Sequence, residues 1–426
     1  MSDSLLYVCL DGLGDDPHPA LDGRTPLEAA ATPNLDTLAR RGRTGSVVTV
    51  GPGIAPESDI GVFGILGYDP SEEHPGRGVL EAMGIGMDFD DGDLAYRINF
   101  ATCEWPEIVD RRVGRDLTSE EAHALADEVA ATLTLPDATF VLRATIEHRG
   151  ALVIKAGGSL SANVTNTDPA YRREGQLGVA LETFDPVVVT ATALDDSGAA
   201  RHAADLTNAF VEGAARILDA SPVNAERRAA GRLPGNLILT RDGGDHRPRL
   251  QSIKERFGWD WGCFVEMPVE RGIAMALGMH TVDAPRLDPA GFGPAADEAY
   301  AVWADLAAQA LEGYQALYVH IKGPDIPAHD GRAEDKRDVI EAIDRAFFGE
   351  VLPRLNLGRT VVGVLADHAT SCVRKAHTAD PVPLVLAGGG FTSDGSASYG
   401  EGACAEGSLG QLLGVDVLPV IRDTLR

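Results

Sequence analysis

The sequence is poor in cysteine and has no long apolar run. Its 426 residues contain five cysteines, Cys9, Cys103, Cys263, Cys372 and Cys404, which are scattered and form no Cys-x-x-Cys pair. This usage argues against a disulfide-rich secreted scaffold, so we expect reduced thiols in a cytoplasmic protein. No stretch reaches the roughly 18 consecutive apolar residues of a membrane-spanning helix, so we expect no membrane span.

Basic residues are also scarce. The chain has 37 Lys and Arg against 64 Asp and Glu, a net charge of −27. This balance argues against nucleic acid and anionic membranes as partners. A small anionic substrate stays compatible with it, because bound metals and a few arginines reverse the field locally. The length predicts two or three domains, and no motif specifies an oligomeric state.

What the sequence does contain is acidic and histidine side chains directly after apolar runs. The runs at residues 5–10, 317–321 and 360–366 are typical of buried parallel strands. Side chains at or just after strand ends are Asp11, Asp325, His329, Asp367, His368 and His377. Because ligands collect at the carboxyl edge of open α/β sheets, we expect these groups to meet there. Carboxylates combined with imidazoles suit Mn²⁺, Zn²⁺ or Co²⁺, so the pattern predicts a two-metal site. Taken alone, Asp11 also fits a simple Asp-Gly turn.

Ser58 lies in a loop rich in glycine and proline, just before an apolar helical segment at residues 62–66. In isolation such a serine is usually a helix N-cap. The alternative is a nucleophile, whose hydroxyl is activated by a metal ion and by the helix N-terminus.

Residues 88–235 differ from the rest of the chain in their hydrophobic pattern, with short strand-like segments and a helical pattern at residues 119–133. We predict an inserted α+β domain there. It carries Arg111, Arg112, Arg115 and Arg149. Guanidinium groups bind phosphate and carboxylate bidentately, although any one of these arginines also fits solvated surface charge. The cluster at residues 111–115 is notable because the protein is acidic.

Several longer motifs together resemble one family, over nearly the whole chain. They include Leu10-Asp11-Gly12-Leu13-Gly14-Asp15, Thr32-Pro33-Asn34-Leu35-Asp36, Ser58-Asp59, Asp110-Arg111-Arg112-Val113-Gly114-Arg115, His320-Ile321-Lys322-Gly323-Pro324-Asp325, Asp367-His368 and His377-Thr378-Ala379-Asp380-Pro381. The chain resembles the cofactor-independent phosphoglycerate mutases of the alkaline phosphatase superfamily, and within these mutases the shorter archaeal-type branch.

The resemblance implies a three-layer α/β/α core with a mostly parallel sheet, formed by residues 1–87 and 236–426. Residues 88–235 would be an inserted α+β domain that binds substrate and closes as a lid. One ion would be held by Asp325, His329 and His377, and the other by Asp11, Ser58, Asp367 and His368. The ions would be Mn²⁺, with Mg²⁺, Co²⁺ or Zn²⁺ as alternatives, and no 2,3-bisphosphoglycerate would be needed.

The implied reaction interconverts 3-phosphoglycerate and 2-phosphoglycerate through a phosphoserine at Ser58. The substrate is a small phosphorylated carboxylate, gripped by Arg111, Arg112, Arg115 and Arg149. The chain departs from the family pattern at Val62, Ala366 and residues 326–328 and 369–371. Three alternatives therefore stand beside the mutase. They are a paralogue acting on a related phospho- or phosphonocarboxylate, a phosphohydrolase, and a catalytically silent metal-binding protein.

Overall fold

The structure is a computed structural model that describes residues 4–175, 177–181, 183–287 and 291–425. It divides into two compact units. The first comprises residues 1–72, 250–270 and 274–426, and the second comprises residues 73–249 and 271–273. The boundaries predicted from the sequence, at 87/88 and 235/236, both lie within the second unit.

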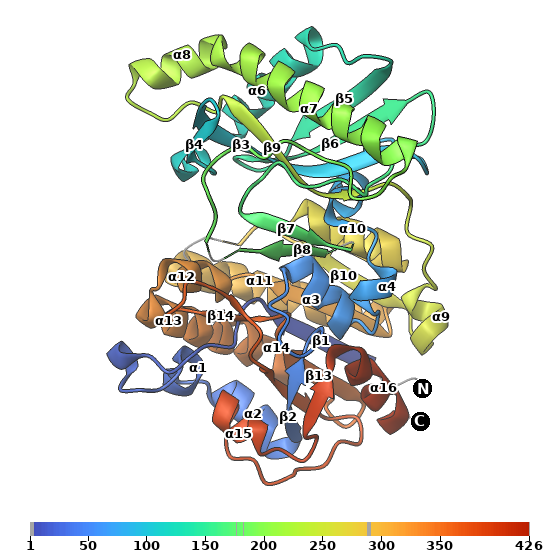
Figure 1. Cartoon of the computed structure of the whole chain (residues 1–426). Helices are drawn as coiled ribbons and strands as arrows, with labels where there is room; N and C mark the ends of the chain where they lie inside the picture. Colours follow the sequence, from blue (N-terminus) through green and yellow to red (C-terminus); the bar gives the residue numbers. More distant parts are fainter. Residues whose placement is uncertain (1–3, 176, 182, 288–290, 426) are drawn as a thin grey trace. The chain divides into compact units, whose positions relative to one another are not determined.

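The first unit is built on an eight-stranded, mostly parallel sheet (Figure 1). In spatial order its strands are β11 (His280–Asp283), β10 (Trp261–Val265), β12 (Ala316–Ile321), β1 (Ser4–Leu10), β13 (Thr360–Leu365), β16 (Val382–Ala387), β2 (Arg43–Val48) and β17 (Gln411–Leu413). Strand β1 pairs in parallel with both β12 and β13. All residues of β12 and β13 are buried, as expected for strands covered on both faces. The three predicted strands are therefore confirmed.

Helices cover both faces of this sheet. The Tyr7 hydroxyl on β1 donates to the carbonyl of Ile65, at the end of α3 (Ser58–Ile65), and the Tyr7 ring meets the Trp261 ring of β10 edge-on. Phe264, three residues along β10 from Trp261, packs against Trp303 of α11 (Pro294–Gly313). Because successive side chains of a strand alternate between faces, α3 and α11 lie on opposite sides. The α/β/α layering of the core is thus confirmed.

A small antiparallel ribbon adds to the parallel sheet. It consists of β14 (Ala369–Ser371) and β15 (Ala376–Thr378), with Thr370 opposite His377. The expectation that every candidate ligand follows a parallel strand is wrong for His377, which lies on this ribbon. Short strands of three residues give no periodic signal, so the sequence could not reveal them.

The second unit contains a five-stranded antiparallel sheet with helices packed on it, which confirms the α+β prediction (Figure 1). Its strands are β4 (Glu107–Asp110), β3 (Leu94–Glu104), β6 (Arg149–Ala156), β5 (Ala138–Ala144) and β9 (Leu237–Gly244). Helix α6 (Ser119–Thr132) packs on β5, and α7 (Gly198–Asp219) packs on β9. Strand β9 pairs with β3, which places residues 237–244 in this unit rather than in the metal-binding core.

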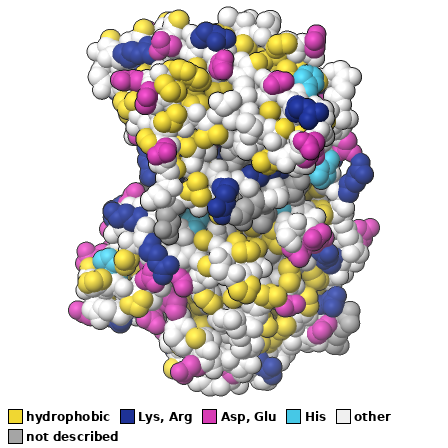
Figure 2. All heavy atoms as spheres, viewed as in Figure 1, with side chains coloured by type: hydrophobic (Ala, Val, Ile, Leu, Met, Phe, Trp, Pro, Cys, Tyr) yellow, Lys and Arg dark blue, Asp and Glu magenta, His cyan; other side chains and the backbone are white. Residues whose placement is uncertain are grey.

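Within the described residues, no helix combines the length and the apolar character that crossing a membrane requires. On the face shown in Figure 2, acidic and basic side chains are interspersed among apolar ones.

Candidate active site

Ser58 is the first residue of α3, and its hydroxyl points at a histidine. The N-cap of α3 is Glu57, whose side chain makes no capping bond, so the interpretation of Ser58 as an N-cap is wrong. Ser58 Oγ lies 3.2 Å from His368 Nε2. Helix α3 approaches closely because residue 61 is glycine: a Cβ there would lie 2.2 Å from the carbonyl oxygen of Asp367. The sequence therefore brings a half-buried hydroxyl to the helix N-terminus and to the predicted metal site at once.

Asp11, Asp367 and His368 converge at the carboxyl ends of β1 and β13. His368 Nε2 lies 3.3 Å from Asp11 Oδ1 and 3.4 Å from Asp367 Oδ2. All three residues are at most 2% exposed. Asp11 Oδ1 and Asp367 Oδ2 are buried and accept no hydrogen bond among the described atoms. Buried carboxylate oxygens without a donor are costly, and they are what a cation ligand set leaves behind.

The electrostatics of this cluster favour a positive charge among its members. Burial disfavours the imidazolium of His368, yet the charges of Asp367 and Asp11 raise its pKa to about 10. Burial, together with the nearby charge of Asp11, raises the pKa of Asp367. The cluster thus binds a proton tightly in the absence of an ion. A divalent cation at the same point fits these donors better than one proton does.

Asp325, His329 and His377 form the second set. Asp325 and His329 stand one helical turn apart on α12 (Asp325–Asp330), with His329 Nε2 3.4 Å from Asp325 Oδ2. His377 Nε2 lies 3.7 Å from Asp325 Oδ1 and 3.2 Å from His329 Nε2.

In both imidazoles of this set the Nδ1 atom is hydrogen-bonded to a backbone carbonyl. His329 Nδ1 faces the carbonyl of Lys375, and His377 Nδ1 faces that of Pro56. A carbonyl only accepts, so each Nδ1 is a donor, and the two Nε2 lone pairs of the neutral rings face each other. A shared proton or a bound metal ion would relieve this contact, and a ring whose Nδ1 donates to a carbonyl is typical of histidine metal ligands.

The two sets are neighbours. The rings of His368 and His377 are stacked, with centroids 3.7 Å apart. Asp325, His368 and His377 also have ligand atoms within 4.8 Å of one another. The structure therefore brings the seven residues predicted to bind metal close together, and their division between two ions stays a prediction.

Two further residues at this site were missed from the sequence. His320 Nε2 lies 3.1 Å and Lys322 Nζ lies 3.0 Å from Asp11 Oδ2. Lys322 Nζ also lies 3.3 Å from Glu270 Oε1. Residues two apart at the end of a strand share one face, but the pairing of β12 with β1, which brings them to Asp11, is not visible in the sequence.

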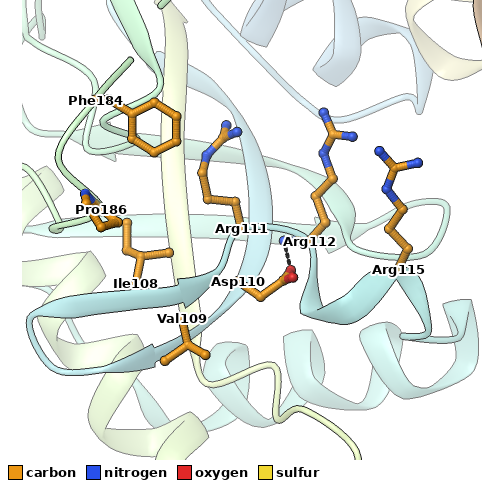
Figure 3. Close-up of a pocket in the computed structure, with 8 residues that line it drawn as sticks. All are labelled: Ile108, Val109, Asp110, Arg111, Arg112, Arg115, Phe184 and Pro186. Atoms are coloured by element: carbon orange, nitrogen blue, oxygen red, sulfur yellow. Dashed lines mark hydrogen bonds between the residues drawn. The ribbon is translucent and has the colours of Figure 1, made fainter. Parts of the chain in front are cut away.

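The predicted substrate arginines lie in the second unit, three of them in one pocket. Arg111, Arg112 and Arg115 line it beside Phe184, and their side chains extend in the same direction (Figure 3). Arg111 pairs with buried Asp168 through both Nε (2.8 Å) and Nη2 (2.5 Å). Among the described residues, no carboxylate pairs with Arg112.

Arg149 is outside the residues that line this pocket, and it pairs with Glu147 at 3.2 Å. It is nevertheless close enough to share an electrostatic environment with the pocket, because burial and then the charge of Arg112 lower its pKa, against the opposing effect of Glu147. Three of the four predicted arginines thus line one pocket and Arg149 does not, while their binding of substrate stays a prediction.

Two further basic residues lie in this environment, and neither was among the predicted site residues. Burial and the charge of Arg241 lower the pKa of Arg97 to about 9. Burial and several arginines lower the pKa of His148 to about 2. A pKa this low leaves His148 a neutral imidazole at neutral pH, whereas arginines that repel one another in a buried cluster favour an anion nearby. The place of Arg97 follows from the pairing of β3 with β6, which the sequence does not reveal, whereas His148 directly precedes Arg149 in the chain.

Comparison with known proteins agrees with this geometry. A family model described as 2,3-bisphosphoglycerate-independent phosphoglycerate mutase matches residues 39–224. A protein of that name from Aeropyrum pernix is 42% identical over 417 residues, covering 96% of each chain. One from Methanopyrus kandleri is 38% identical over 423 residues, covering 98% of this chain and 96% of the relative. The chain belongs to the 2,3-bisphosphoglycerate-independent phosphoglycerate mutase family.

Solved structures show the same fold as this member of the mutase family. The Pyrococcus horikoshii protein PH0037 superposes with a TM-score of 0.80 at 29% identity, covering 100% of this chain and 98% of that one. The cofactor-independent phosphoglycerate mutase of Thermoplasma acidophilum superposes with a TM-score of 0.62 at 34% identity, covering 99% and 100%.

The departures of this phosphoglycerate mutase family member from the family pattern fall at packed positions. Val62 on α3 is 2% exposed, and Ala366 and Ala369 are equally buried. A Cβ on Gly14 would lie 2.9 Å from that of Ala369, so a small residue fits there. None of these positions removes a candidate ligand.

Proposed function

We propose that this chain interconverts 3-phosphoglycerate and 2-phosphoglycerate without 2,3-bisphosphoglycerate, through a phosphoserine at Ser58. The observation that carries the proposal is the convergence of two carboxylate–imidazole sets on a serine hydroxyl at a helix N-terminus. Its activity class is an intramolecular phosphotransferase, as the names of the relatives indicate.

Two divalent ions, with Mn²⁺ as the first choice and Mg²⁺, Co²⁺ or Zn²⁺ as alternatives, fit the ligand sets. Asp325, His329 and His377 would hold one ion. Asp11, Ser58, Asp367 and His368 would hold the other. When bound, such ions lower the pKa of a coordinated hydroxyl and neutralise a phosphoryl group.

Ser58 supplies the acceptor oxygen of the first transfer. A bond forms between Ser58 Oγ and phosphorus while the bond from phosphorus to the C3 oxygen of the substrate breaks. The proton lost by Ser58 balances the one gained by the freed glycerate hydroxyl. The second transfer reverses these changes at the C2 oxygen and regenerates Ser58. Lys322, beside Asp11, adds positive charge where phosphoryl charge develops.

The arginine cluster of the second unit binds the carboxylate and hydroxyl groups of glycerate. Arg111, Arg112 and Arg115 supply planar donors on one side of a pocket, and Arg149 adds charge nearby. A mutase has to retain the dephosphorylated glycerate between the two transfers, whereas a hydrolase does not. The buried cluster of cations therefore favours a mutase over a phosphohydrolase.

The test is a coupled assay. Purified chain is incubated with Mn²⁺ and 3-phosphoglycerate, and enolase reports the 2-phosphoglycerate formed. We expect turnover that stops on chelation and is lost by at least about 10³-fold in Ser58→Ala, as for loss of a nucleophile. Metal-loaded wild-type protein without turnover would exclude the phosphoglycerate reaction. A Ser58→Ala variant with full activity would exclude the phosphoserine.

A further inference from the structure

Thr370 lies between the two candidate ligand sets and touches both. It is in the middle of β14 and is fully buried. Its Oγ1 donates to Asp325 Oδ1 at 2.7 Å. The same oxygen lies 3.0 Å from His368 Nδ1. One hydroxyl thus connects a residue of the Asp325 set to a residue of the Asp11 set.

The single proton of the Thr370 hydroxyl fixes the direction of these two hydrogen bonds. A hydroxyl has a single proton, and an ionised carboxylate only accepts, so the proton of Thr370 goes to Asp325. Thr370 Oγ1 then accepts from His368, which places a hydrogen on Nδ1. In the neutral ring this leaves the lone pair on Nε2, the nitrogen that faces Ser58, Asp11 and Asp367.

The surrounding backbone holds Thr370 in this place. Its N–H donates to the carbonyl of Gly14 at 2.9 Å, and its carbonyl accepts from Lys336 Nζ at 2.8 Å. Gly12 leaves the space for its hydroxyl, because a Cβ there would lie 2.5 Å from Thr370 Oγ1. Gly12 has φ +62°, which also favours glycine. On the other side, Thr370 is paired with His377 in the ribbon.

We propose that Thr370 is a positioning residue that couples the two metal sites. It sets the tautomer of His368 for one ion and orients Asp325 for the other. Filling one site therefore organises a ligand of the second, and the two ions bind with positive cooperativity. This inference rests on the metal assignment of the proposed function, and it goes beyond it by linking the two sites through a residue that contacts neither ion.

The test measures metal binding by the full chain rather than turnover. Mn²⁺ is titrated into metal-free protein, and binding is followed by calorimetry and by the electron paramagnetic resonance signal of free Mn²⁺. The variants are Thr370→Val, which keeps the shape and removes the hydroxyl, and Thr370→Ser, which keeps the hydroxyl. Thr378→Val is the matched control, because Thr378 is buried in the paired strand and makes no side-chain hydrogen bond among the described residues.

We expect Thr370→Val to lose Mn²⁺ affinity by roughly 10- to 100-fold at both sites, together with their cooperativity, as for loss of an outer-shell partner. Thr370→Ser and Thr378→Val should stay within about threefold of wild type, a range well below that effect. A Thr370→Val protein that binds two Mn²⁺ ions as wild type does overturns the inference. So does a Thr370→Ser protein whose Mn²⁺ affinity falls by roughly 10-fold or more, and this result decides the case if the valine variant does not fold.

The two proposals fail separately. A wild-type chain that binds two Mn²⁺ ions but does not form 2-phosphoglycerate contradicts the proposed function and leaves the coupling testable. A wild-type chain that binds fewer than two ions contradicts the ligand assignment, and with it the coupling.

Discussion

Lys322 shows how single side chains complete the site around the candidate ligands. Its ammonium lies between Asp11 and Glu270, so one positive charge compensates two buried carboxylates. The placement of Asp11, Asp325, Asp367 and His368 could be predicted from the sequence, because each lies at or just after the end of a parallel strand. Lys322 could not, since its role depends on which strand lies next to β1.

Replacing Lys322 by methionine is expected to destabilise the metal-free chain by roughly 3 kcal/mol, because it leaves buried carboxylates uncompensated. Added Mn²⁺ should recover part of this loss. Urea denaturation with and without Mn²⁺ measures both effects. Lys254→Met is the control, since Lys254 forms an exposed pair with Asp260, and its loss should cost no more than about 1 kcal/mol. Equal effects of the two substitutions would contradict the role of Lys322.

At the scale of elements, hydrophobic runs predicted the central strands and their parallel direction. They did not predict the ribbon β14–β15, which carries His377, because three-residue strands lack a periodic signal. They also did not predict that β9 pairs with β3, because strand pairing across about 140 residues depends on tertiary packing rather than on local pattern. The positions of Arg97 and Arg241 in the cation cluster follow from that pairing, and so they were missed as well.

The approach of α3 to β13 gives a prediction for Gly61. Gly61→Ala would place a Cβ 2.2 Å from the backbone oxygen of Asp367, so α3 has to move away. We expect a loss of roughly 1–3 kcal/mol in the free energy of unfolding, and a fall in activity, because Ser58 moves with the helix. Gly313→Ala, at the end of α11 with open space around its Cβ, should change neither by a comparable amount. Full stability and activity in Gly61→Ala would contradict this packing.

Glu401 at the start of α15 (Glu401–Ala405) gives a pH prediction. It accepts from Thr25 Oγ1 at 2.7 Å, and burial raises its pKa to about 7. Between pH 4.5 and 7 the unfolded chain releases this proton while the folded chain keeps it, so this group lowers stability as pH rises. Glu401→Gln should therefore gain about 1 kcal/mol or more over wild type at pH 8, and little at pH 4.5. Denaturation at both pH values checks this, and a gain independent of pH would contradict it.

At the scale of the whole molecule, the two units divide the chemistry. Every candidate metal ligand lies in the first unit, and the arginine pocket lies in the second. The change in hydrophobic pattern near residue 88 predicted a division into two units. The observed units begin and end elsewhere, because residues 73–87 and 236–249 belong with the antiparallel sheet. Composition changes gradually along the chain, whereas packing sets a definite boundary.

Metal binding is expected to stabilise the folded chain. At a free Mn²⁺ concentration of 100 times the dissociation constant, one site contributes about 2.7 kcal/mol. Excess chelator should accordingly lower the thermal midpoint of Mn²⁺-loaded protein by several degrees, and Asp325→Asn should reduce the difference. Calorimetric scans with and without chelator measure it. An identical midpoint in both scans would mean that the two ligand sets hold no ion.

The most direct test of the central claim is to trap the phosphoserine. The Mn²⁺-loaded chain is mixed with 3-phosphoglycerate labelled in its phosphoryl group, quenched in acid within the first turnover, digested, and analysed by mass spectrometry. The account predicts the label on the peptide that contains Ser58, and none on any peptide of Ser58→Ala. Formation of 2-phosphoglycerate with no label on Ser58 at any time would contradict it.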